Sequence, residues 1–199
     1  MNPEWERRRF LGTALASVAA FVAAGCSPSH SKSRPKPRPT TSVPGVTAGP
    51  GSFGDRIDVG AIDDVRRAVA SSRAPVYIAE ARSYVVAFPA GLADRARGVY
   101  PKDALPMLDA GIIVLYQRCT HLGCRVPWCK TSEWFECPCH DAKFDQVGEH
   151  RQGPAPRGLD LVKSSIENGR LVLDTGAILQ GAPMGTDTTR QEPTGPFCV

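Results

Sequence analysis

Two short motifs rich in cysteine and histidine constrain this sequence more than any other feature. The first, CTHLGC, covers residues 119–124, and the second, CPCH, covers residues 137–140. Each contains two cysteines and one histidine, and each follows an apolar run with the composition of a β-strand. The sequence therefore predicts two loops at strand ends, each offering one thiol and one imidazole to a shared site.

Three kinds of chemistry compete for these four groups, which are Cys119, His121, Cys137 and His140. Zinc in a Cys₂His₂ site is chemically possible, but C-x-H followed by C-x-C-H is unlike the usual finger spacings. A cysteine nucleophile with a histidine base is a second possibility, but it does not explain why the pattern occurs twice. A [2Fe–2S] centre in which two histidines replace two cysteines on one iron uses all four groups. We favour this third interpretation.

One further cysteine remains in each motif, namely Cys124 and Cys139. A disulfide between them would tie the two loops together beside the metal. The zinc interpretation leaves this second pair of cysteines without a role at the metal.

The two motifs, taken with the residues that follow them, resemble those of a known family. FDQVG at 144–148 and GPAPRGL at 153–159 complete the resemblance to Rieske iron–sulfur proteins. It covers about residues 75–199 and is closest to the Rieske proteins of quinol–cytochrome c reductase complexes, of the actinobacterial type. The resemblance implies a small all-β fold, an antiparallel β-sandwich with one or two short helices.

The resemblance also implies a role for each residue of the motifs. Cys119 and Cys137 would bind the inner iron of one Rieske [2Fe–2S] cluster per chain, and His121 and His140 the outer iron. A disulfide would join the two remaining motif cysteines, Cys124 and Cys139. The proline-rich loop GPAP would cover the cluster, and Leu122 would shield it from water at a docking surface.

A Rieske protein of this kind is implied to carry one electron at a time. It would take the electron from a quinol bound to a membrane cytochrome b subunit, at the exposed ligand histidines, and pass it to a cytochrome c. A Rieske ferredoxin of an aromatic-ring oxygenase is one alternative, although that class typically lacks the extra cysteine in each loop and is cytosolic. The small subunit of an arsenite-oxidase-type complex is another alternative.

Residues 1–26 have the pattern of an export or anchor segment. Arg7, Arg8 and Arg9 precede an apolar run from Phe10 to Ala24, which resembles a twin-arginine signal. Cys26 follows small residues, as in a bacterial lipoprotein processing site; an uncleaved membrane anchor is the alternative. Both interpretations tether the protein at the outer face of the cytoplasmic membrane.

Residues 27–52 have the composition of an extended linker, rich in Pro, Ser, Thr and basic residues. The first 52 residues carry seven Lys/Arg and two Glu, whereas residues 53–199 carry seventeen Lys/Arg and eighteen Asp/Glu. The basic charge therefore belongs to the N-terminal segment. This balance gives no indication of a nucleic-acid-binding face on the domain predicted at 53–199.

Many short β-rich runs separated by Gly/Pro turns predict an all-β domain with one minor helix. A helix is expected at 61–71 and a helical turn at 104–108. The expected strands are 75–78, 83–88, 111–116, 134–136, 143–148 and 161–174, the last interrupted by a turn at 167–169.

Two more features of the sequence lead to predictions. Cys129 and Cys198 are left over, and in an oxidising compartment we expect them to pair and to hold the C-terminal tail. High-potential family members continue with Gly-Ser-x-Tyr after the second histidine, whereas this chain has Asp141, Ala142, Lys143 and Phe144. We therefore expect a redox potential at the lower end for quinol-oxidising Rieske centres, which suits menaquinol.

Overall fold

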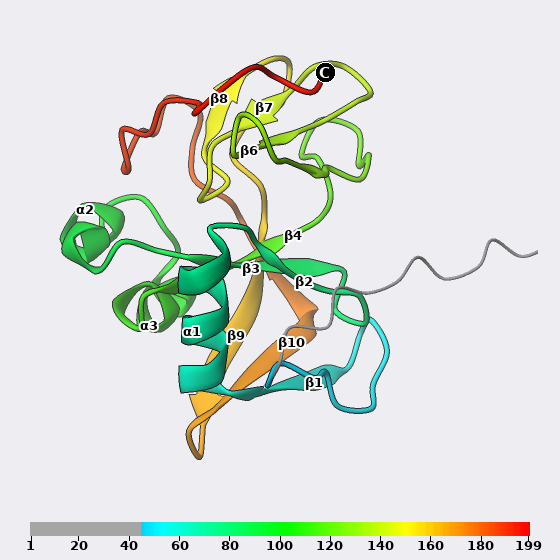
Figure 1. The fold of residues 1–199 in the computed structure, drawn as a ribbon, viewed down its shortest axis with the longest axis vertical. Helices are drawn as coiled ribbons and strands as arrows, with labels where there is room; N and C mark the ends of the chain where they lie inside the picture. The colour runs from blue at the N-terminus through cyan, green and yellow to red at the C-terminus, as the bar shows by residue number, and fades with distance from the viewer. Residues whose placement is uncertain (1–44) are drawn as a thin grey trace, which may run out of the picture. The chain divides into compact units, whose positions relative to one another are not determined.

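The computed structural model describes residues 45–199 (Figure 1). The expected export signal, Cys26 and the expected linker up to residue 44 lie outside the described residues. The described end of that linker contacts the domain, because Val46 is buried and the N–H of Gly49 donates to the carbonyl of Asp58 at 2.7 Å. Across residues 45–199, no helix is long and apolar enough to cross a bilayer.

The larger of the two sheets in the described residues is a six-stranded antiparallel sheet with strand order β1-β10-β9-β4-β3-β2 (Figure 1). Its strands are β1 (Arg56–Ala61), β2 (Val76–Ile78), β3 (Ser83–Ala87), β4 (Ile112–Tyr116), β9 (Leu161–Glu167) and β10 (Arg170–Leu179). β9 and β10 form a hairpin whose turn contains Asn168 and Gly169, both with positive φ, as a tight turn between twisted strands requires.

A second, four-stranded antiparallel sheet lies between β4 and β9 in the sequence and carries the two motifs. Its strands are β5 (Trp128–Cys129), β6 (Trp134–Glu136), β7 (Lys143–Phe144) and β8 (His150–Gln152), in that order. These strands are short because turns and cysteine-rich loops interrupt the apolar runs. The second motif connects β6 to β7.

The helices are few and short. They are α1 (Ile62–Ser72), the 3₁₀ turn η1 (Ala90–Leu92), α2 (Ala93–Ala96), the 3₁₀ turn η2 (Lys102–Ala104) and α3 (Leu105–Asp109). α1 has Asp63 and Asp64 in its first turn, where negative charge complements the helix dipole. It ends at Ser72, and the next residue, Arg73, caps it in a left-handed conformation with φ 48°.

Two hydrophobic clusters form the core. In one, the buried face of α1, with Val65 and Val69, packs against side chains of the six-stranded sheet such as Leu171. The other joins the two sheets, because Leu115 of β4 belongs to the same cluster as Phe144 of β7. Burying side chains of this size stabilises the fold by about 1.5–3 kcal/mol each. The sheet that carries the motifs is therefore fixed to the larger sheet by apolar packing.

The expected antiparallel β fold is confirmed, and three short α-helices accompany the sheets of the described residues where one or two short helices were expected. The expected helix at 61–71 lies within one residue of α1, and the expected turn at 167–169 separates β9 from β10. The expected strand 143–148 is shorter, because only Lys143 and Phe144 pair and the chain then turns at a buried Asp145. β1, α2, β5 and β8 were not expected from the sequence.

Candidate metal centre

The first motif forms a tight loop just after β4. The N–H of Cys119 donates to the carbonyl of Cys124 at 2.8 Å, and the N–H of Gly123 donates to the carbonyl of Cys119 at 2.9 Å. Gly123 has φ 77°, a conformation that glycine adopts without steric cost. The guanidinium of Arg118 donates to the carbonyl of Gly123 at 2.6 Å. The turn is thus closed by its own backbone.

The second motif forms a matching loop between β6 and β7. The N–H of Cys137 donates to the carbonyl of Ala142 at 2.8 Å, which closes the loop around His140. Asp141 has φ 61°, and its short side chain is one of the few that tolerate this left-handed conformation. Its carboxylate contacts the ammonium of Lys143. The loop therefore turns at Asp141, where the family pattern has glycine.

The structure brings the two loops side by side. A disulfide joins Cys124 to Cys139, the pair that the resemblance implies. The sulfur atoms of these two residues and of Cys137 all lie within 4.8 Å of one another. On the opposing loops, the rings of His121 and His140 meet edge to face with centroids 4.7 Å apart. Both motifs therefore contribute to one site.

Burial divides the four candidate ligands into an inner and an outer pair. Cys119 and Cys137 are buried and form no disulfide. His140 is exposed and His121 is half-buried. The thiols are thus set inside the protein, whereas the imidazoles lie at its surface.

Burial raises the pKa of the Cys119 thiol to about 11. The backbone N–H of His121 lowers this pKa, and the neighbouring thiol of Cys137 raises it further. A metal binds the thiolate form, so metal binding must displace these protons. The backbone N–H groups of His121 and Leu122 lower the pKa of Cys119 and so favour its thiolate form.

The proline-rich segment that starts at Gly153 packs against both loops. Gly153 has φ 88°, and a Cβ on it would lie 2.6 Å from the Cα of Ala142 in the second loop. The hydroxyl of Thr120 in the first loop donates to the carbonyl of Arg157 at 2.9 Å. Ala155, which lies between Gly153 and Arg157 in the sequence, is fully buried. The segment thus braces the two motifs at the side where glycine permits close approach.

Leu122 is the most exposed large apolar side chain of the described residues, with 70% of its surface accessible. It lies in the first loop, next to the candidate ligand His121. An exposed leucine next to His121, whose ring meets that of His140, gives this end of the molecule an apolar contact point.

The expected pairing of the last two cysteines is present as well. A disulfide joins Cys129 of β5 to Cys198 near the C-terminus. Sequence reasoning missed Glu136, whose carboxylate lies within 4.8 Å of both of these sulfur atoms and is fully buried. The sequence does contain a signal for this buried carboxylate, because Glu136 is the single charged residue in the run WFEC.

A second buried acidic group was also missed. The carboxylate of Asp145 accepts the N–H groups of Val147 and Glu149, and Glu149 accepts the hydroxyl of Tyr100 at 2.8 Å. Burial, and then the charge of Glu149, raise the pKa of Asp145 to about 7. The side chain of Arg151 lies 3.9 Å from Asp145 and partly offsets this shift. The group orders the turn after β7.

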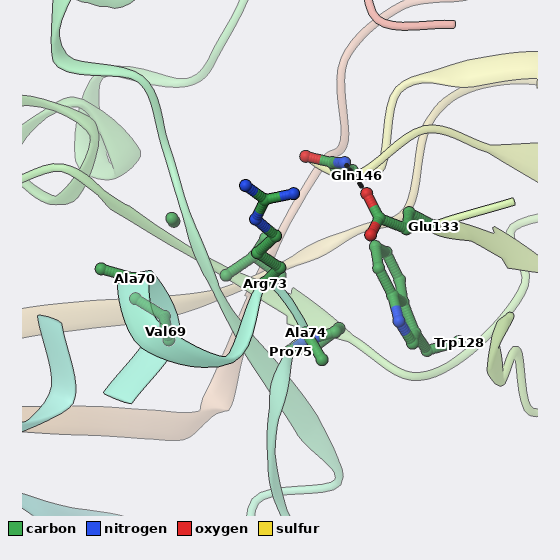
Figure 2. A pocket seen from close by; sticks show the side chains of 10 residues that line it. Val69, Ala70, Arg73, Ala74, Pro75, Trp128, Glu133 and Gln146 are labelled. Carbon is green, nitrogen blue, oxygen red and sulfur yellow. Dashed lines mark hydrogen bonds between the residues drawn. The ribbon is translucent and has the colours of Figure 1, made fainter. Parts of the chain in front are cut away.

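A pocket of about 350 Å³ lies apart from the loops, between the end of α1 and the start of β6 (Figure 2). Figure 2 shows the guanidinium of Arg73 on one side and the indole of Trp128 on the other. The amide of Gln146 donates to the carboxylate of Glu133 at 3.3 Å. None of the four candidate ligands lines this pocket.

The donor set fits a Rieske cluster. Two buried thiols and two imidazoles are the ligand types that such a cluster requires. The Nδ1 atom of His121 is buried and has no hydrogen-bond partner within the described residues. A buried ring nitrogen without a partner is costly in a folded protein unless it binds a metal or a water molecule. Zinc and nucleophile interpretations leave the inner and outer arrangement of the two loops unexplained.

Comparisons with known proteins agree with this geometry. Residues 84–165 match the family model of the Rieske [2Fe-2S] domain. A stretch of 55 residues is 47% identical to cytochrome b6-f complex iron-sulfur subunit 1 of Nostoc sp. (strain PCC 7120) and covers 28% of this chain and 31% of that relative. Cytochrome b6-f complex iron-sulfur subunit 2 of Trichormus variabilis is 28% identical over 169 residues, or 84% of each chain.

Among solved structures, the soluble domain of Rieske protein II from Sulfolobus acidocaldarius covers 78% of this chain and 89% of its own, with 18% identity and a TM-score of 0.39. The chain covers about a third of the length of the Nostoc relative and most of the length of the Trichormus relative. With its motif-bearing sheet inside the matched region, the chain contains a Rieske [2Fe-2S] domain, with such a cluster as its cofactor, and is homologous to the iron–sulfur subunits of cytochrome b6-f complexes.

Proposed function

We propose that this chain is the iron–sulfur subunit of a membrane complex that oxidises quinol and reduces a cytochrome c. The bound [2Fe–2S] cluster supplies the capacity to take up and release one electron. The observation that supports this function best is the arrangement of the site, with two buried thiols behind two imidazoles at the surface. A partner can approach the imidazole side, while the thiol side is enclosed by protein.

Cys119 and Cys137 would hold the inner iron, and His121 and His140 the outer iron. The Nδ1 atom of His121 is the ligand nitrogen in this proposal, because it is buried and has no other partner within the described residues. Its Nε2 atom is then free to face a substrate. The disulfide between Cys124 and Cys139 keeps the two loops, and hence the two pairs of ligands, in register.

The exposed imidazole gives the proposed oxidation of quinol its route for protons. In its deprotonated form, the ring nitrogen of His140 that does not bind iron would accept a hydrogen bond from a quinol hydroxyl and then take its proton at the same atom. Leu122 is exposed beside this point and contributes an apolar surface that excludes water from the contact. Proton transfer to the protein thus accompanies the loss of an electron from the quinol.

The proposed partners are a membrane cytochrome b subunit, which presents the quinol, and a cytochrome c, which accepts the electron. Homology to subunits of cytochrome b6-f complexes supports the first of these partners. The residues 141–144, which lack the serine and tyrosine of high-potential members, support menaquinol as the substrate. We propose in addition that the complex is of the actinobacterial type. Residues 1–26 would tether the chain at the outer face of the cytoplasmic membrane, and residues 27–44 would let the head move between partners.

The disulfide between the loops disfavours the alternative of an oxygenase ferredoxin, which typically lacks these cysteines. The proposed function is tested in the source organism by deleting the gene and restoring either the wild-type chain or the His140→Ala variant. Membranes that contain the wild-type chain should reduce cytochrome c with menaquinol, whereas membranes of the other two strains should not. Full activity in the deletion strain would overturn the proposal, and loss of arsenite oxidation alone would favour the arsenite-oxidase alternative.

A further inference from the structure

The last six residues of the chain lie along the loop that precedes β6. The N–H and the hydroxyl of Thr194 donate to the carbonyls of Ser132 and Thr131, both at 2.9 Å. The hydroxyl of Thr131 donates in turn to the carbonyl of Pro196 at 2.6 Å. The disulfide between Cys129 and Cys198 fixes the far end of this segment. We call residues 194–199 the C-terminal clasp.

The clasp supplies most of the hydrogen bonds of a buried carboxylate. Only 1% of the surface of Glu136 is accessible. One carboxylate oxygen accepts the hydroxyl of Ser132 at 2.5 Å, and the other accepts the N–H groups of Cys198 at 2.7 Å and Val199 at 3.0 Å. A buried carboxylate is costly unless such donors surround it. Glu136 is the residue immediately before the proposed ligand Cys137.

The clasp also contacts the other end of the second loop. The ring of Phe197 packs against Trp134 with centroids 5.7 Å apart. The buried ammonium of Lys143 lies 4.7 Å from the centroid of the Phe197 ring and contacts the carboxylate of Asp141. Asp141 is the residue immediately after the proposed ligand His140. The clasp thus reaches the flanking residues on both sides of the second loop.

We infer that the C-terminal clasp, acting through Glu136 and Lys143, positions the loop that carries Cys137 and His140. This inference rests on the ligand set of the proposed function. Glu136 and Lys143 are opposite each other on β6 and β7, so the two contacts of the clasp act on paired positions at the base of one loop. Without the clasp, Glu136 keeps one of its three donors, and the ammonium of Lys143 loses the ring that covers it.

Glu136 offers a direct test on the full-length protein with its cluster bound. Glu136→Ala removes the acceptor for both N–H groups of the clasp. Glu136→Gln retains it, because the amide oxygen can accept these N–H groups and the amide nitrogen can donate to the hydroxyl of Ser132. We expect Glu136→Ala to lose its cluster to a chelator roughly tenfold faster than wild type, and Glu136→Gln to restore the wild-type rate. The EPR spectrum of the reduced cluster should change only in the alanine variant.

The disulfide provides a second arm that leaves Glu136 in place. Replacing both cysteines in a Cys129→Ser, Cys198→Ser variant should change the EPR spectrum and speed cluster loss in the same direction as Glu136→Ala. Val85→Ala is the control for general destabilisation, because Val85 is fully buried in the other hydrophobic cluster. It should lower the unfolding temperature and leave the EPR spectrum unchanged.

The outcomes separate this inference from the proposed function. A wild-type protein with a Rieske EPR spectrum, together with clasp variants that keep that spectrum and the wild-type rate of cluster loss, would show that the clasp does not position the loop. Changes equal to those of Val85→Ala would also reject it. A wild-type protein that binds no [2Fe–2S] cluster would overturn the proposed ligand set and the clasp inference with it.

Discussion

The imidazole rings of His121 and His140 meet edge to face, with centroids 4.7 Å apart, although they belong to different loops of the chain. A disulfide between the same two loops holds them in this relation. Two neighbouring imidazoles would repel each other if both carried a positive charge. As neutral ligands, both can bind one iron without this repulsion. The pair is therefore the part of the site on which the proposed ligand set depends most.

Replacing either histidine should abolish the Rieske signal. We expect His121→Ala and His140→Ala, each made separately, to lack the EPR spectrum of a reduced Rieske cluster, because one iron would lose a protein ligand. His30→Ala is the matched control, since His30 lies in the expected linker at 27–52, outside both motifs. The measurement is the EPR spectrum of each variant, together with its iron and sulfide content. A Rieske spectrum in either of the two ligand variants would remove that histidine from the ligand set.

Gly153 lies close to the second loop. A prediction can therefore distinguish the effect of a steric clash with that loop from the effect of backbone strain. A Cβ at Gly153 would lie 2.6 Å from the Cα of Ala142, whereas a Cβ at Gly169 would meet nothing within 4 Å. Both glycines have positive φ, so alanine costs about 1–2 kcal/mol of strain at either position. Gly153→Ala should in addition displace the loop and speed loss of the cluster.

Visible absorption during exposure to a chelator provides the comparison of the two variants. We expect Gly169→Ala to lose its cluster at the wild-type rate and Gly153→Ala to lose it much faster. Equal rates would mean that the proline-rich segment does not brace the second loop.

The motifs allowed more of the site to be predicted than of the fold. Their spacing pointed to four metal-binding groups, because thiols and imidazoles at two strand ends have few other uses. β8 was missed because its three residues, His150–Gln152, have no apolar alternation, and the strand exists only through its pairing with β7. β1 was missed although its sequence, RIDVGA, does alternate polar and apolar residues; it is ordered by pairing with the distant β10. Such pairing is a tertiary effect that local sequence does not encode.

The buried polar groups show the same limit. The sequence places Glu136 and Asp145 within the expected strands 134–136 and 143–148, and a charged residue in such a strand is usually exposed. Their burial depends on partners that are distant in sequence. Cys198 and Val199 supply N–H groups to Glu136, and Thr189 donates its hydroxyl to Asp145. The chain's last residues were expected to be held by a disulfide, but their contact with a carboxylate could not be inferred from spacing.

Thiol counting tests the disulfide pattern as a whole. After the cluster is removed in denaturant without reductant, we expect an alkylating reagent to label Cys119 and Cys137, which form no disulfide. The four cysteines of the two disulfides should remain unlabelled until a reductant is added; they are Cys124, Cys139, Cys129 and Cys198. Peptide mapping by mass spectrometry identifies the labelled positions. Label on Cys129 or Cys198 before reduction would contradict the second disulfide.

The same disulfide should contribute to stability, because it closes a loop with a sequence separation of 69 residues. The chain-entropy model gives about 4 kcal/mol for a loop of this length. Urea unfolding of the Cys129→Ser, Cys198→Ser variant should show a loss of this order. A loss below about 1 kcal/mol would indicate that the unfolded chain is already restricted in this region.

Stability should depend on pH through Asp145. Its pKa is raised from 3.8 to about 7, mainly by burial and then by the charge of Glu149. Between these values the folded protein holds a proton that the unfolded chain has released, so stability is greatest at low pH and is lost as pH rises towards 7. This group alone should lower the free energy of unfolding by about 3 kcal/mol from pH 5 to pH 8.

Asp145→Asn should remove this part of the pH dependence, because the amide oxygen can still accept the N–H groups of Val147 and Glu149. Urea unfolding of both proteins at the two pH values gives the comparison. Asp103→Asn is the control, since Asp103 pairs with Lys163 at the surface. Parallel profiles for wild type and Asp145→Asn would show that Asp145 does not titrate in this range.

The redox potential is the property in which residues 141–144 should matter most. Ala142 and Phe144 are fully buried and replace the serine and tyrosine of high-potential members, whose hydroxyls donate to sulfur atoms and stabilise the reduced cluster. A hydrogen bond to a charged acceptor is worth about 1.5–3 kcal/mol, and about 1.4 kcal/mol corresponds to 59 mV for one electron. Ala142→Ser and Phe144→Tyr should therefore each raise the midpoint potential by roughly 60–130 mV.

The backbone supports this prediction, because Asp141 already adopts the left-handed conformation for which the family pattern has glycine, with φ 61°. A hydroxyl introduced at position 142 or 144 would therefore lie in a loop that turns at the same position as in the family pattern. Phe53→Tyr is the matched control, since it adds the same hydroxyl to a ring that stacks on Tyr116, outside the motif-bearing sheet. A redox titration followed by circular dichroism measures all three midpoints. If Ala142→Ser and Phe144→Tyr both match the wild-type midpoint, the missing hydroxyls do not set the potential, and the charge of Asp141 becomes the better explanation for a low value.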